Sequence, residues 1–171
     1  MAKTYDIGNT GIKGFDELFR NLNAEISSIK ERSMNGLIKA AIIIRRDMDK
    51  TPPLIPVDTG NLRASWFVMT AKGLKSDKPA FKALETPAKT AMLNGSYNLA
   101  IAEAQGMVAG NTSFIVIGFG ANYASPVHEM FGKGPVDWSR KDSGPKFFES
   151  SIKRNKDVVL KTIRDNVQIK K

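Results

Sequence analysis

Three short groups of residues have the types and spacings that enzymes use for chemistry. Asp58-Thr59-Gly60 can present a carboxylate on a tight turn, and two such carboxylates that share a proton can activate water, one as base and one as acid. His128-Glu129 places a base beside an acid, and Gly118-Phe119-Gly120 follows an apolar run and could begin a phosphate-binding loop. Each group can act only if the neighbouring elements position it.

The Asp-Thr-Gly group allows an enzymatic interpretation. Val57–Gly60 and the later run Ile115–Gly118 resemble two elements of retroviral-type aspartic proteases. Those proteases are homodimers with one Asp-Thr-Gly in each subunit. Such proteases are almost entirely β-structured, whereas here a long helical pattern precedes the group and a lysine-rich segment follows it. The prolines just before Val57 also disfavour the interior strand that the motif needs. The protease, with Asp58 as its acid, remains an alternative.

The same residues can form an ordinary turn. The Asp58 carboxylate can accept a backbone N–H from Gly60 or Asn61, and Gly60 can adopt the positive φ that reverses the chain. We therefore predict a structural corner that leads into a strand beginning at Leu62. The corner consists of Asp58, Thr59, Gly60, Leu62 and Arg63.

The other two groups lack a supporting context. Neighbouring residues on a helix point in different directions, so we predict that His128 and Glu129 do not form a pair and that His128 is partly exposed. The glycine pattern lacks its third glycine, because Tyr123 stands in that place. The absence of cysteine and the single histidine exclude thiolate chemistry and a zinc cluster. We expect no catalytic residue, no metal site and no cofactor.

Composition and charge describe a basic chain of one-domain size. The 171 residues are 42% hydrophobic, which suffices for a single domain spanning 1–171. The formal charge is +9, and residues 113–171 carry eleven basic and six acidic groups. This excess suits an acidic partner, a solvated face or a nucleic acid, so a basic nucleic-acid-binding module is a second alternative. The sequence shows no long apolar run and no signal peptide, and we expect a soluble protein made in the cytoplasm.

The first helix is the clearest element in the pattern. Apolar residues recur every three or four positions over 14–50, which predicts a long amphipathic helix. The segment 33–36 marks a place where it could break. Asn9 or Thr10 is suited to cap its start, and Pro52-Pro53 should end it.

Two strands follow, separated by a long insertion. The β-branched and aromatic runs at 62–70 and 113–119 predict strands that pair antiparallel. The insertion at 71–112 is expected to be a mobile loop with one short helix at 97–105. The predicted fold is α+β: a long N-terminal helix packed on a small antiparallel sheet, with this insertion and a C-terminal helix.

The last third contains two helices and an aromatic loop. A short helix is predicted at 123–131 and an amphipathic one at 145–166, joined by a Gly/Pro-rich loop at 132–144. Trp138 lies in this loop and could anchor a partner, whereas Trp66 lies in the first strand and should belong to the core.

Two signatures and their order carry a resemblance over most of the chain. Pro-x-Asp-Thr-Gly-x-Leu-Arg-x-Ser at Pro56–Ser65 is followed downstream by Tyr-Ala-x-x-Val-x-Glu at Tyr123–Glu129. Pro145-Lys146-Phe147-Phe148 then opens the last helix. This order, after a long N-terminal helix, resembles the tail-completion or head–tail connector proteins found at the neck of tailed bacteriophages.

The resemblance implies a structural role. Such a subunit assembles into a homo-oligomeric ring in the neck of the virion and joins the portal side of the capsid to the tail, without a reaction or a cofactor. Its partners would be further copies of itself, portal or adaptor proteins, and tail-tube or tail-terminator proteins, close to DNA in the channel and with no membrane. We expect the basic C-terminal helix to dock on an acidic neighbour. The residues expected to contact other subunits or partners are Tyr123, Glu129, Trp138, Arg140, Phe147, Phe148, Lys153 and Arg154.

Overall fold

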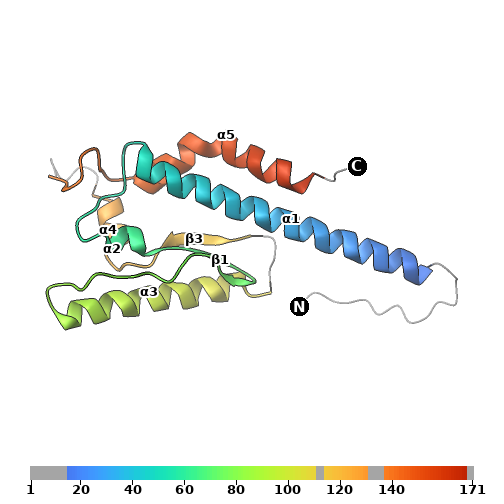
Figure 1. The fold of residues 1–171 in the computed structure, drawn as a ribbon, viewed down its shortest axis with the longest axis horizontal. Coiled ribbons are helices and arrows are strands. Elements are labelled where there is room, and N and C mark those ends of the chain that lie inside the picture. Colours follow the sequence, from blue (N-terminus) through green and yellow to red (C-terminus); the bar gives the residue numbers. More distant parts are fainter. Residues whose placement is uncertain (1–14, 111–113, 131–136, 169–171) are drawn as a thin grey trace.

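The computed structural model describes residues 15–110, 114–130 and 137–168. Helices α1 (Phe15–Lys50) and α5 (Phe147–Val167) lie side by side above a small sheet, and α3 (Pro87–Val108) lies below it (Figure 1). The predicted α+β architecture is confirmed: a long N-terminal helix on a small antiparallel sheet, with a C-terminal helix. No helix in these described ranges is both long enough and apolar enough to cross a membrane.

The sheet has three strands in the order β2-β1-β3. The middle strand β1 (Trp66–Thr70) pairs antiparallel with β2 (Gly73–Leu74) and with β3 (Val116–Phe119), as predicted for the two longer strands. The register of β1 and β3 places Trp66 opposite Phe119. The sheet is short because two of its strands have only four or fewer residues, so most of the core comes from helices.

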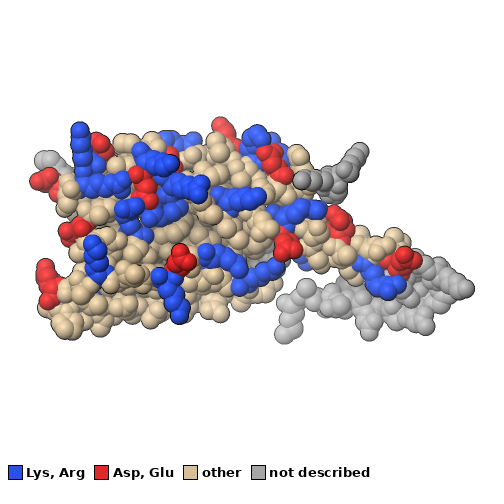
Figure 2. Space-filling model, viewed as in Figure 1, with Lys and Arg blue, Asp and Glu red and all other residues tan. Residues whose placement is uncertain are grey.

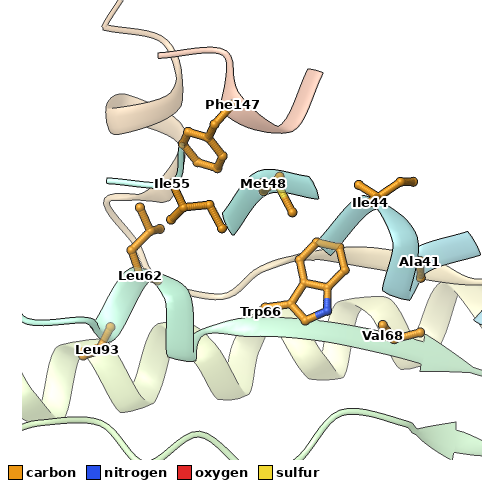
Figure 3. Packing of buried hydrophobic residues seen from close by; sticks show 10 residues of the cluster. Ala41, Ile44, Met48, Ile55, Leu62, Trp66, Val68, Leu93 and Phe147 are labelled. Atoms are coloured by element: carbon orange, nitrogen blue, oxygen red, sulfur yellow. The ribbon is translucent and has the colours of Figure 1, made fainter. Parts of the chain in front are cut away.

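Alternate side chains of β1 serve two separate cores. Trp66 and Val68 face α1 and pack with Ala41 and Ile44, as Figure 3 shows, and Phe119 stacks edge-to-face on Trp66 at 5.2 Å. The intervening residues of the strand, Phe67 and Met69, pack with Tyr97, Ala104 and Val108 of α3. Every residue of β1 is therefore buried, and Trp66 is a core residue as predicted.

The prediction that a strand begins at Leu62 is wrong. Asn61–Ala64 form the short helix α2, and the strand begins four residues later, at Trp66. The reason is local: Gly60 lies in the left-handed region with φ of 90°, its carbonyl accepts the Ala64 N–H at 3.0 Å, and this closes one helical turn.

Helix α1 continues through the segment where a break was expected. Gly36 is helical, and a Cβ added there would lie 3.2 Å from the Ile163 Cα in α5. The glycine therefore allows close approach of α5 and does not interrupt α1. The helix ends at Lys50, before Pro52-Pro53 as predicted, and the expected cap at Asn9 or Thr10 lies outside the described residues.

The insertion is more ordered than the sequence suggested. It contains β2 and the 22-residue helix α3 instead of a mobile loop with a short helix at 97–105. Thr86 caps α3 by accepting the Lys89 N–H, and Pro87 occupies the first turn. The buried residues Leu93, Tyr97, Ala104 and Val108 hold the helix against the sheet and the corner.

The C-terminal region follows the prediction in part. The short helix α4 spans Ala124–His128 and is shorter than the helix predicted at 123–131. Helix α5 begins at Phe147, two residues after the predicted start, and residues 131–136 of the predicted helix and loop lie outside the described residues. Helix α5 runs along α1, where the Ser151 hydroxyl donates to the Ile44 carbonyl at 2.9 Å and Lys39 donates to Asn166 at 2.7 Å. These contacts fix α5 on α1 along most of its length.

Candidate functional site

The two signature segments, distant in sequence, line one pocket. Pro56–Gly60 and Leu62 form one part of its lining, and Tyr123 and Val127 of the segment around α4 form another. We call this the corner pocket; its volume is about 470 Å³, and Trp138 and Leu84 complete its apolar wall. It lies at the end of the molecule where α2 and α4 meet (Figure 1).

The turn beside the pocket uses a different side chain from the one predicted. The Thr59 hydroxyl, and not the Asp58 carboxylate, accepts the Asn61 N–H, at 3.3 Å. Gly60 does adopt the predicted positive φ. Because the Thr59 hydroxyl supplies the acceptor for the turn, Asp58 is not needed there. Its exposed side chain lines the pocket.

Tyr123 lies in the pocket wall with Asp58 and Thr59. Burial raises the pKa of its phenol, and the negative charge of Asp58 adds to the increase, while the Thr59 side chain opposes it. The phenol is therefore neutral near pH 7 and available as a hydrogen-bonding group. The predicted contact residue Tyr123 thus lines the pocket.

A single carboxylate ties the corner to the end of α1. Asp49 contacts Arg45 at 2.5 Å, and its Oδ1 lies 3.0 Å from Arg63 Nε and 3.7 Å from Arg140 Nη1. The latter two contacts are charge attractions without hydrogen-bond alignment. Burial lowers the pKa of Arg45, Asp49 opposes this, and the neighbouring guanidinium groups of Arg63 and Arg140 add to the decrease. We call these four residues the Asp49 cluster.

No family model, curated protein or solved structure matches the chain.

The pair that the sequence argument rejected does form. His128 Nδ1 lies 2.8 Å from Glu129 Oε1, because Glu129 lies just beyond the last residue of α4 and so escapes the helical directions on which the prediction relied. Glu129 also pairs with Lys146; this contact lowers the pKa of the Glu129 carboxyl, and His128 adds to the decrease. The His128 ring packs edge-on against Phe147, 5.1 Å away. The pair joins α4 to the start of α5.

Several predicted partner contacts have roles inside the chain. Phe147 is 1% exposed and so is closed to a partner, and Phe148 stacks on Trp66 at 5.9 Å. Arg140 donates to the Asp49 carbonyl at 2.7 Å, and Arg154 binds Asp47 at 2.6 Å. Among the predicted residues, Tyr123 and Trp138 line the pocket, and Lys153, whose side chain is 75% exposed, pairs with Glu149.

Asn61 is a corner residue that the sequence argument missed. It is buried, its amide nitrogen donates to the Lys82 carbonyl at 2.9 Å, and its amide oxygen accepts the Lys82 N–H at 2.8 Å. This pair of bonds ties the corner to the segment that precedes α3. An asparagine just after a turn glycine was the available signal, but its partner lies 21 residues away and no local pattern reveals it.

Metal-ligating side chains are not clustered in the part of the chain that the structure describes. The described residues contain no group of three His, Cys, Asp or Glu side chains placed to hold a metal ion. The corner pocket combines apolar and aromatic walls with Asp58 and Asp137. Such a lining is suited to accept a protruding side chain from another protein surface.

Proposed function

We propose that this protein is a structural subunit of a bacteriophage neck, which forms a ring and joins the portal side of the capsid to the tail. The observation that carries the proposal is the convergence of the two signature segments. Pro56–Ser65 and Tyr123–Glu129 were only an ordered pair in sequence, and their residues now line one pocket. Because the two segments line one pocket, they can act together by binding a neighbouring protein.

The frame around the pocket also suits a permanent building block. The Asp49 cluster fixes the end of α1 to α2 and to the segment before α5. Arg154 links α5 to the same region by donating to the Pro52 carbonyl at 2.9 Å. A pocket on such a frame needs little rearrangement on binding, which lowers the entropic cost of assembly.

This geometry supports the protease alternative less well than the connector. Its acid would need to stand at the end of a strand and face a second copy of itself, as in a dimeric aspartic protease. Here Asp58 precedes the helix α2 and lies beside the neutral phenol of Tyr123. The nucleic-acid alternative rests on the net charge alone, and several of the arginines concerned are engaged by Asp49 or Asp47.

The test is imaging of the purified chain, alone and mixed with portal-containing heads that lack it. We expect closed rings of the chain, or added density at the portal vertex, and recovery of tail joining when tails are supplied. The matched control is the chain with Trp138→Ala and Val57→Asp, which alters the pocket wall while leaving the Asp49 cluster intact. Heads that remain unaltered, together with peptide cleavage that Asp58→Asn abolishes, would overturn the proposal in favour of the protease.

A further inference from the structure

The corner pocket has an unusual combination of lining groups. Its walls are apolar and aromatic, yet the exposed carboxylates of Asp58 and Asp137 also line it. Neither carboxylate forms an ion pair within the part of the chain that the structure describes. The complementary ligand is an apolar side chain accompanied by cations.

The outer face of α5 carries such a group. Leu160 is 48% exposed, and Lys156 and Arg164 lie four residues before and after it, on the same helix face. Both cations are exposed and neither has an ion-pair partner among the described residues, whereas the neighbouring Lys153 and Lys161 pair with acids one turn away. Figure 2 shows Lys and Arg side chains spread over the face that contains α1 and α5.

We propose that the corner pocket of one copy receives Leu160 of a second copy, with Lys156 and Arg164 of that copy facing Asp58 and Asp137. The two surfaces are different, so the contact is head-to-tail and leaves each copy with one free pocket and one free helix face. Contacts of this kind close into rings when the rotation between copies permits. The inference deepens the proposed function, because it names the surfaces through which the ring would form.

The absence of cysteine from the sequence allows a direct test by engineered disulfides. A chain with Val57→Cys is mixed with a size-tagged chain carrying Leu160→Cys and oxidised gently. Val57 lies in the pocket wall, and Leu160 is its proposed guest, so heterodimers should exceed both homodimers. A matched pair that replaces Leu160→Cys by Leu99→Cys, which is 61% exposed on α3, measures random collision.

Charge variants then test the recognition itself. Asp58→Lys on the pocket chain should lower the heterodimer yield at least about tenfold, because it places like charges together. Adding Lys156→Glu to the partner chain should restore much of the yield. Asp58 is exposed and Thr59 supplies the turn bond, so Asp58→Lys should leave the fold intact, which circular dichroism checks. A yield equal to that of the Leu99→Cys pair, or one that is unchanged by Asp58→Lys, would overturn the inference.

The outcomes separate this inference from the proposed function. Rings or portal-bound density without the Val57–Leu160 cross-link would mean that the subunit is a connector that uses another contact. A specific, charge-dependent cross-link in a chain that never joins heads would establish the contact and refute the neck role.

Discussion

Thr59 has a larger structural role than its position in an Asp-Thr-Gly motif suggests. Its hydroxyl accepts the Asn61 N–H at 3.3 Å. We predict that Thr59→Ala lowers the free energy of unfolding by about 1 kcal/mol, since this bond is lost at a partly buried site. Urea denaturation of the purified variant measures this change.

Asp58→Ala is the matched control for that variant. Asp58 is exposed and does not supply the turn bond, so its removal should change the free energy of unfolding by less than about 0.5 kcal/mol. A larger loss from Asp58→Ala than from Thr59→Ala would show that the Asp58 carboxylate supports the turn, as the sequence predicted.

Asp49 is the residue on which the corner depends most. It is the carboxylate that neutralises part of the charge of Arg45, Arg63 and Arg140. Asp49→Asn would leave three cations close together in a half-buried site, and we expect a loss of about 2–4 kcal/mol. Thermal denaturation at low and high salt measures it, and high salt should recover part of the loss because it screens the repulsion.

A surface ion pair provides the comparison. Lys161 and Asp165 lie 2.5 Å apart on α5, with both side chains largely exposed. Asp165→Asn should therefore cost less than about 0.5 kcal/mol. Equal losses for the two variants would show that the Asp49 cluster behaves as an ordinary surface pair.

Among the elements, the packing of α1 on α5 depends on a missing side chain. A Cβ at Gly36 would lie 3.2 Å from both the Ile163 Cα and the Asn166 Cβ. Gly36→Leu should force the helices apart and lower the free energy of unfolding by about 1–3 kcal/mol. Chemical denaturation measures the change, and fluorescence of Trp66 in the adjoining core would report the disturbed packing.

Gly95 in α3 is the matched helical glycine. A Cβ there meets nothing within 4 Å, so Gly95→Ala should raise the free energy of unfolding by about 0.5–1 kcal/mol through helix propensity alone. Destabilisation by Gly95→Ala together with tolerance of Gly36→Leu would contradict the helix packing described for both glycines.

The elements that the sequence predicted well are those with a local signal. The periodicity of α1 and α5 and the β-branched run of β3 are sufficient to place them, and proline marks the end of α1. Helix α3 was largely missed because its apolar residues are not confined to one stripe: Leu93, Tyr97 and Val108 form the buried face, but Met92, Leu99 and Met107 are exposed on the others. Gly36 was wrongly predicted to mark a break in α1, because the contact that requires a glycine there is with α5, more than a hundred residues away.

The candidate site was predictable as two segments and not as a pocket. Residue types at Pro56–Gly60 and Tyr123–Val127 drew attention to both, yet only the fold shows that they face each other. The partners of Arg140 and Arg154 were unpredictable for the same reason, since Asp49 and Asp47 lie far from them in sequence. Arg140 and Arg154, which we predicted to contact other subunits, also bind residues within the chain.

At the scale of the whole molecule, the N-terminal part of α1 extends beyond the sheet and α5 (Figure 1). Leu18, Leu22 and Ile26 lie on one face of this arm and are 60%, 51% and 41% exposed. In the isolated chain we predict that backbone amides near these residues exchange hydrogen faster than those around Ile44 and Met48, which lie in the core. Hydrogen exchange with mass spectrometry measures both regions.

The same measurement on assembled material tests the use of the arm. Exposed apolar side chains in a row on one helix face are the kind of surface that assembly covers, so we predict that exchange near Leu18 and Leu22 slows on assembly. Leu18→Ser with Leu22→Ser should weaken assembly and leave the melting temperature of the free chain nearly unchanged. If the amides of the arm exchange equally fast in the complete assembly and in the free chain, the arm makes no contact in the assembly.

The length of α1 has a mechanical consequence. Its 36 residues at 1.5 Å rise give a rod of about 54 Å, and its C-terminal half packs against α5 and the sheet. In the proposed ring, an arm of this reach that points toward the adjoining subunit would overlap it. Subunits that overlap in this way would have to join in a defined order, which the direction of the arm would set.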